Sequence, residues 1–270
     1  MDIFAKPWAF VRKDFTASAS YKLSFLMQFF SIFISASMFF FISRLLGGTM
    51  NPYLKKYGGD YFSYVIIGVA FGDYLGLALK SMTETIRSGQ VAGTLEALLA
   101  TPTRIPTIIV SSSLYSFIWT SLRVVVYLVL GSLVFDLQIQ QANYLGGLIV
   151  LILTILAFSS FGILSASFIM VLKRGDPFTW IFTTLSGLVG GVYYPITVLP
   201  QWLQIVSRYL PITYSLEGMR YALLKGYTLR QLLPNITVLS LFSLVMLPVG
   251  LACFHFAVRK AKSDGTLTQF

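Results

Sequence analysis

Residues 144–172 read YLGGLIVLILTILAFSSFGILSASFIMVL and contain no Asp, Glu, Lys or Arg. About 20 consecutive apolar residues cross the hydrocarbon core of a bilayer as a helix, so this stretch predicts a transmembrane helix. Comparable apolar runs, the last of them shorter, lie at 23–43, 61–80, 109–135, 236–258 and 178–194. The six runs predict an all-α integral membrane protein with six transmembrane helices.

The composition of the chain also favours the bilayer as its solvent. Of the 270 residues, 56% are hydrophobic and only 11% are charged, whereas an average soluble domain has about 25% charged residues. So few charges cannot cover the surface of a soluble fold of this size. The length suits one membrane domain over 1–270 and leaves no room for a second sizeable soluble one.

The charges predict how the chain is oriented. The formal net charge is +10, and the basic residues lie at the ends of the apolar runs. This placement indicates contact with anionic membrane lipid and not with nucleic acid. With a cytoplasmic N-terminus, twelve of the 20 Lys and Arg residues fall in cytoplasmic segments and seven in outer segments. We therefore expect a multi-pass protein of the cytoplasmic (inner) membrane with both termini in the cytoplasm.

The segment before the first span, 1–22, has an amphipathic pattern. Phe4, Trp8, Val11 and Phe15 recur at helical spacing. This pattern predicts a helix lying at the inner membrane surface, and a simple polar lead-in is the alternative.

Between the second and third spans lies a cytoplasmic segment, 81–104, that is typical of a protein contact. Gly89 and Gly93 are expected to break the helix that continues from the second span. Thr94 can then cap a short helix that Pro102 helps to stop. Its apolar edge consists of Leu95, Leu98 and Leu99. Such an edge suits a groove in a soluble partner, although an interfacial connector that touches lipid is possible on the same pattern.

The segment 195–235, before the last span, is apolar but interrupted by prolines. Residues from Pro200 to Tyr209 predict an amphipathic helix, because Trp202 and Val206 lie four residues apart. Broken helices at membrane depth need protein or a water-filled cavity around them. We expect this segment to be re-entrant from the outer side and to lie near the outer mouth of any pathway.

Several residues inside the spans are candidates for a pathway or a dimer interface. Asp73 in the second span and Arg123 in the third can pair with each other, line a pathway or snorkel. Small residues four apart favour close helix packing, and they are Gly68, Gly72 and Gly76 in the second span and Gly187 and Gly191 in the fifth. Three aromatic residues can line an apolar conduit or form an interfacial belt, namely Tyr115, Trp119 and Tyr193.

The sequence contains little that could carry out catalysis. Its single cysteine, Cys253, and single histidine, His255, predict neither a disulfide nor a metal site. There is no Gly-x-x-x-x-Gly-Lys-Ser/Thr phosphate loop, so we expect this chain to bind no cofactor. An intramembrane enzyme and an ion-coupled secondary transporter are two possible classes of function, but no Gly-x-Ser-x-Gly elbow and no clear inverted repeat support them.

Two segments resemble those of type-two ABC exporter permeases. One is Gly93-Thr94-Leu95-Glu96-Ala97-Leu98-Leu99-Ala100-Thr101-Pro102, which looks like the family's cytoplasmic coupling segment. The other comprises Tyr194-Pro195, Leu199-Pro200-x-Trp202 and Leu210-Pro211-x-x-Tyr214 through Arg220, which look like its outer segment.

The resemblance covers essentially the whole chain and implies a mechanism. Such permeases form dimers, whose spans one and five meet, and each copy binds a cytoplasmic ABC ATPase that holds ATP and Mg²⁺. They export drugs, lipids or lipid-linked polysaccharides. By this resemblance the ATPase cleft would receive Thr94, Leu95, Glu96, Leu98 and Leu99, with Glu96 as the polar contact.

Overall fold

The computed structural model describes residues 8, 11–12, 15–16, 22–46, 48–91, 93, 105–137, 139, 141–172 and 177–263. Within these residues all regular secondary structure is helical, which confirms the predicted fold class. The predicted interfacial helix at 1–22 lies mostly outside the described residues.

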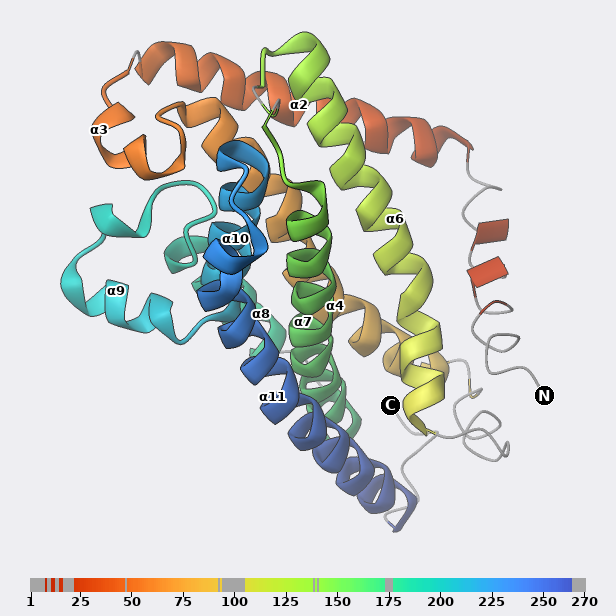
Figure 1. The fold of residues 1–270 in the computed structure, drawn as a ribbon. Coiled ribbons are helices and arrows are strands. Elements are labelled where there is room, and N and C mark those ends of the chain that lie inside the picture. The colour runs from red at the N-terminus through yellow and green to blue at the C-terminus, as the bar shows by residue number, and fades with distance from the viewer. Residues whose placement is uncertain are drawn as a thin grey trace.

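Five helices of the described chain are long and apolar enough to cross a membrane. They follow the predicted runs and are α2 (Lys22–Leu46), α4 (Tyr61–Val91), α6 (Ile105–Val134), α7 (Tyr144–Leu172) and α11 (Leu229–Ser263). Short helices α3 (Asn51–Leu54) and η1 (Lys55–Tyr57) connect α2 to α4. Figure 1 shows α4 and α7 in the middle of the bundle, with α2 and α6 beside α4 and with α11 packed along α7.

The last long helix starts earlier than the apolar run at 236–258 suggests. α11 begins at Leu229, directly after Thr228, whose backbone N–H donates to Gln231 Oε1 at 2.9 Å. The Thr228 hydroxyl donates to the same oxygen at 3.1 Å, so the Gln231 side chain satisfies the N–H of the residue before the helix, as in one half of a capping box. This cap explains why the helix extends through Pro234 into the segment that was expected to be re-entrant.

The predicted fifth span is the shortest of the apolar helices. α8 (Pro177–Val189) has 13 residues, which at 1.5 Å per residue gives a length of about 20 Å. A helix needs roughly 30 Å to cross the hydrocarbon core. The chain bends after Val189, where Gly191 has a φ of +82°, and does not continue as a helix to Tyr194. A sixth crossing therefore stays a prediction.

The segment after α8 folds back on the bundle through three short elements. They are η2 (Ile196–Val198), α9 (Gln201–Arg208) and α10 (Pro211–Lys225). α9 falls within the predicted 200–209 and turns Trp202 and Ile205 outward, and Tyr209, directly after it, is also exposed. α10 packs against α4, α7 and α11, and most of its side chains are buried. α10 is consequently part of the core and holds the polar groups described below.

Candidate functional site

An ion pair joins α4 and α6 within their membrane-spanning regions. Arg123 Nη2 lies 3.1 Å from Asp73 Oδ2, and both side chains are partly exposed, at 29% and 40%. Next to this pair, Tyr74 OH donates to Ser121 Oγ at 2.8 Å. Among the alternatives that the sequence leaves open, the structure shows direct pairing. The pairing offsets the cost of two charges at membrane depth, while their exposure leaves them accessible to a ligand.

A cavity of about 170 Å³ lies beside the ion pair, between α4 and α8. Its polar lining includes Asp73, Thr183 and Ser186, and Ser186 Oγ is buried without a hydrogen-bond partner among the described residues. Gly76 and Gly187 also line the cavity, and a Cβ atom at either position would meet no atom within 4 Å. This face offers open space, a carboxylate and an unsatisfied hydroxyl, which together can hold a polar group.

The structure separates the three aromatic candidates. Tyr193 lines the cavity and stacks on Phe39 of α2, with 6.1 Å between the ring centroids. Trp119 lies elsewhere on α6, where its Nε1 donates to Gln28 Oε1 of α2 at 2.6 Å. Tyr115 is half-buried on α6 and does not line this cavity. Only Tyr193 therefore joins Asp73 and Gly187 at one place.

The two glycines predicted to share the fifth span do not lie on one helix face. Gly187 is in α8, but Gly191 follows the end of that helix in a left-handed conformation that favours glycine. The carbonyl oxygen of Gly191 accepts a hydrogen bond from Tyr64 OH at 2.9 Å. Gly191 thus forms the turn that brings the outer segment onto α4.

The predicted ATPase-coupling residues Thr94, Leu95, Glu96, Leu98 and Leu99 lie outside the described residues. The structure does show how the chain reaches them. α4 continues through Gly89 to Val91, so the expected break at Gly89 is wrong. A glycine within a helix costs only about 1 kcal/mol relative to alanine, which the rest of the helix can offset. Gly93, in contrast, has a φ of +65°, which a helix cannot accommodate.

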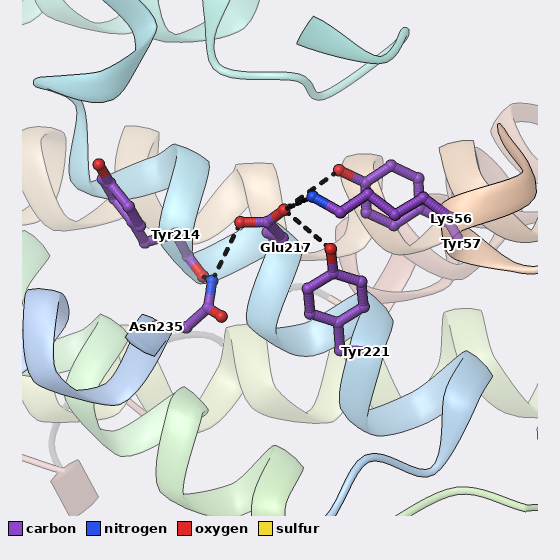
Figure 2. A network of polar contacts seen from close by, with 6 residues as sticks. All are labelled: Lys56, Tyr57, Tyr214, Glu217, Tyr221 and Asn235. Atoms are coloured by element: carbon purple, nitrogen blue, oxygen red, sulfur yellow. Dashed lines mark hydrogen bonds and ion pairs between the residues drawn. The ribbon is translucent and has the colours of Figure 1, made fainter. Parts of the chain in front are cut away.

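A polar network at the outer segment was not predicted from the sequence. It is centred on the Glu217 carboxylate of α10 (Figure 2). Four side chains donate to this carboxylate, namely Lys56 at 2.6 Å, Tyr221 at 3.0 Å, Asn235 at 3.3 Å and Tyr57 at 3.5 Å. The donors come from η1, from α10 itself and from α11. One carboxylate therefore links three elements that are far apart in the sequence.

The ion pair of this network shifts the pKa values of both partners. Burial raises the pKa of Glu217, but the hydrogen bond and the charge of Lys56, with the bonds from Tyr221 and Asn235, outweigh burial and lower it below its ordinary value. Burial lowers the pKa of Lys56, but the hydrogen bond and the charge of Glu217 raise it overall. Both charged forms are therefore stabilised.

Arg220, on the next turn of α10, is 2% exposed. Its Nε donates to the Tyr64 carbonyl at 3.1 Å and its Nη2 to the Val192 carbonyl at 3.2 Å. The guanidinium carbon lies 3.4 Å from the centroid of the Tyr64 ring, a cation–π contact. Arg220 thus ties α10 to α4 and to the turn after α8. The sequence did contain one signal for these contacts, a Glu and an Arg three residues apart in an apolar segment interrupted by prolines.

Long apolar helices, a charged pair at membrane depth and a folded-back segment after α8 define a polytopic membrane protein. The family model described as ABC-2 type transporter matches residues 8–224, so the chain belongs to this family. The chain is 26% identical over 197 residues to the inner membrane transport permease YadH of Escherichia coli strain K12, covering 71% of this chain and 73% of that protein. The YadH permeases of Escherichia coli O157:H7 and Shigella flexneri match to the same extent.

Proposed function

We propose that this chain is the permease subunit of an ATP-binding cassette exporter in the inner membrane. A separate cytoplasmic ATPase would bind ATP and Mg²⁺, because the sequence has no phosphate loop. Two copies of the chain would form a homodimer with the pathway between them and with all termini in the cytoplasm. The name of the similar YadH permeases supports the membrane assignment and the transport role.

The observation that carries the proposal is the position of α4. This helix has 31 residues and a length of about 45 Å. Near the outer end of α4, the Tyr64 carbonyl binds Arg220. Further along the helix, Asp73 pairs with Arg123. The helix ends at Val91, three residues before Thr94. A continuous helix transmits displacement along its axis because it deforms little. Movement of the coupling segment by the ATPase would therefore reach both the intramembrane pair and the outer segment.

The exposed apolar faces of α2 and α8 support the dimer. Ile34 of α2 and Leu188 of α8 are exposed, at 51% and 57%, and Tyr193 connects the two helices by stacking on Phe39. Contact between copies through these faces would bring their α4–α8 cavities together. A shared space with apolar walls and a paired charge suits an amphipathic or lipid-linked cargo, a class that includes drugs, lipids and polysaccharides.

Copurification and ATP turnover test the role of the coupling segment. We expect the tagged chain to recover a phosphate-loop ATPase, and Glu96→Gln or Leu98→Asp to lower the ATPase activity of the reconstituted complex at least fivefold. Glu84→Gln, which alters an exposed acid on α4, is the matched control and should leave turnover unchanged. Recovery of no ATPase, or equal turnover in all variants, would contradict the proposal.

Cysteine crosslinking tests the dimer. In a Cys253→Ala background, Leu188→Cys should form a disulfide-linked dimer in membranes on mild oxidation. Leu148→Cys is the control, because Leu148 is about as exposed, at 53%, but lies on α7. Crosslinking at Leu148 and not at Leu188 would place the interface on another face.

A further inference from the structure

A second cavity lies far along the chain from the ion pair, on the outside of the bundle between α7 and α11. It has a volume of about 430 Å³ and is lined by Leu164, Ser167, Phe168, Val171, Ala252, Cys253, Phe256 and Ala257. The large side chains Phe168, Val171 and Phe256 are exposed, at 46%, 40% and 67%, whereas Ser167 and Ala257 are buried. The exposed residues are therefore the rims of a groove, and the small buried ones are its floor.

The groove presents almost no polar group to a ligand. Its one hydroxyl on the floor, Ser167 Oγ, donates to the Ile163 carbonyl at 2.7 Å and is thus satisfied within α7. An empty apolar groove forfeits the dispersion contacts that hydrocarbon would make with its walls. Its chemistry consequently fits a flexible hydrocarbon chain and not a polar cargo.

Two basic residues lie on the same side of α11 as the groove, just beyond its end. Arg259 and Lys260 follow Ala252 and Cys253 by seven residues each, so they lie on the groove's face about 10 Å further along the helix. Both are exposed, and the ion pairs found among the described residues, Lys56–Glu217 and Arg123–Asp73, involve neither of them. Each basic residue near an anionic membrane surface contributes about a fivefold gain in binding. A lipid headgroup with a negative charge would sit here while its chain fills the groove.

We propose that the α7–α11 groove is a binding site for an anionic phospholipid, whose acyl chain lies between Phe168 and Phe256 and whose phosphate is held by Arg259 and Lys260. The groove is separate from the α4–α8 cavity and from the proposed pathway between two copies of the chain. On its inner side, Ala257 packs in the apolar cluster that contains Met82 and Ile86 of α4. The bound lipid therefore lies one layer of side chains from the helix that leads into the predicted coupling segment.

Photocrosslinking in nanodiscs tests this site whichever way the protein is oriented, because both leaflets have the same composition. The full-length protein is placed in phosphatidylcholine nanodiscs with a trace of phosphatidylglycerol that carries a diazirine on one acyl chain. We expect adducts on peptides from 164–171 and 252–257, and at least fivefold fewer with a phosphatidylcholine probe. Arg259→Gln with Lys260→Gln should lower the phosphatidylglycerol adducts at least fivefold.

Two further variants separate the headgroup from the chain. Arg12→Gln with Lys80→Gln removes the same charge from exposed positions away from the groove and should leave the adducts unchanged. Ala252→Phe fills the groove and should abolish adducts at 164–171 even with both basic residues present. Equal labelling by the two probes, adducts that survive loss of both basic residues, or crosslinks to a second copy of the chain at this groove would each overturn the proposal. None of these outcomes depends on ATP turnover, so the experiment tests the lipid site independently of the proposed export function.

Discussion

Replacing single glycines of α4 tests how the outer segment is held. A Cβ atom built on Gly68 would lie 2.0 Å from the Val192 carbonyl oxygen and 2.6 Å from Arg220 Nη2. Real Cβ atoms do not come this close, so Gly68→Ala must displace the turn after α8 and the hydrogen bond between Arg220 and Val192. Gly76→Ala is the matched control on the same helix, since a Cβ there meets no atom within 4 Å.

The size of the stability loss expected for Gly68→Ala depends on the kind of atom that the new Cβ would meet. Overpacking a well-packed contact costs about 1–3 kcal/mol, and the upper end applies here because a backbone carbonyl cannot rotate away. For a chain of this size, about 3 kcal/mol corresponds to a fall in melting temperature of roughly 5–10 °C. Gly76→Ala should change the melting temperature by no more than about 2 °C, since it adds only a small gain in helix propensity.

Thermal unfolding in detergent, followed by intrinsic tryptophan fluorescence at one heating rate, measures both variants. Size-exclusion chromatography checks beforehand that each variant is folded and monodisperse. If Gly68→Ala melts at the wild-type temperature, or if Gly76→Ala loses as much stability as Gly68→Ala, then the close approach of α4 to Val192 and Arg220 does not hold the outer segment in place.

Four other substitutions probe three further contacts by the same assay. Because the pKa of Glu217 is lowered from its ordinary 4.5, its stabilisation is present above that pH and is lost as the pH falls through the folded value, and Glu217→Gln should flatten this acid decline. The pKa of Lys56 is raised from 10.5, so its contribution to stability is complete below that pH and is lost only as the pH rises through the folded value. Lys56→Gln should abolish this loss of stability at alkaline pH. Asp73→Asn removes the ion-pair partner of Arg123 and should cost about 2–3 kcal/mol of stability. Exchanging the two residues should restore most of this loss. Equal stability of the wild type, Asp73→Asn and the exchange variant would refute the pairing. Gly191→Ala forces a Cβ into a backbone with a φ of +82° and should cost about 1–2 kcal/mol, so an unchanged melting temperature would contradict the turn.

The spans were predictable because the bilayer imposes a local rule on the sequence. Each of the five long helices contains most of a run that could be identified from about 20 apolar residues in succession. The rule fails at boundaries, where short-range hydrogen bonds decide. The hydrogen bonds from Thr228 to the Gln231 side chain start α11 before its apolar run, and the turn at Gly191 ends the helical path of α8 early. Both signals are in the sequence, but hydropathy does not register them.

The polar contacts could be predicted only in part. Asp73 and Arg123 attract attention because charges inside an apolar run are costly, although spacing alone left pairing as one of several outcomes. Glu217 and Lys56 were harder, since 161 residues separate them and each looked like an ordinary residue of an outer loop. Arg220 is one of the seven basic residues counted in outer segments, yet the structure buries it against Tyr64 with 2% of it exposed.

The sequence by itself determined that this protein is a helical membrane protein and that its second span leads into a motif resembling a coupling segment. Those properties depend on residues that are neighbours in the chain, which is why composition and spacing report them. Only the tertiary structure decided that the outer segment returns into the core through α10, and that α4 holds both Arg123 and Arg220 along one helix. These contacts join residues from distant parts of the chain, and their energy depends on burial and geometry, which no local pattern of residues contains.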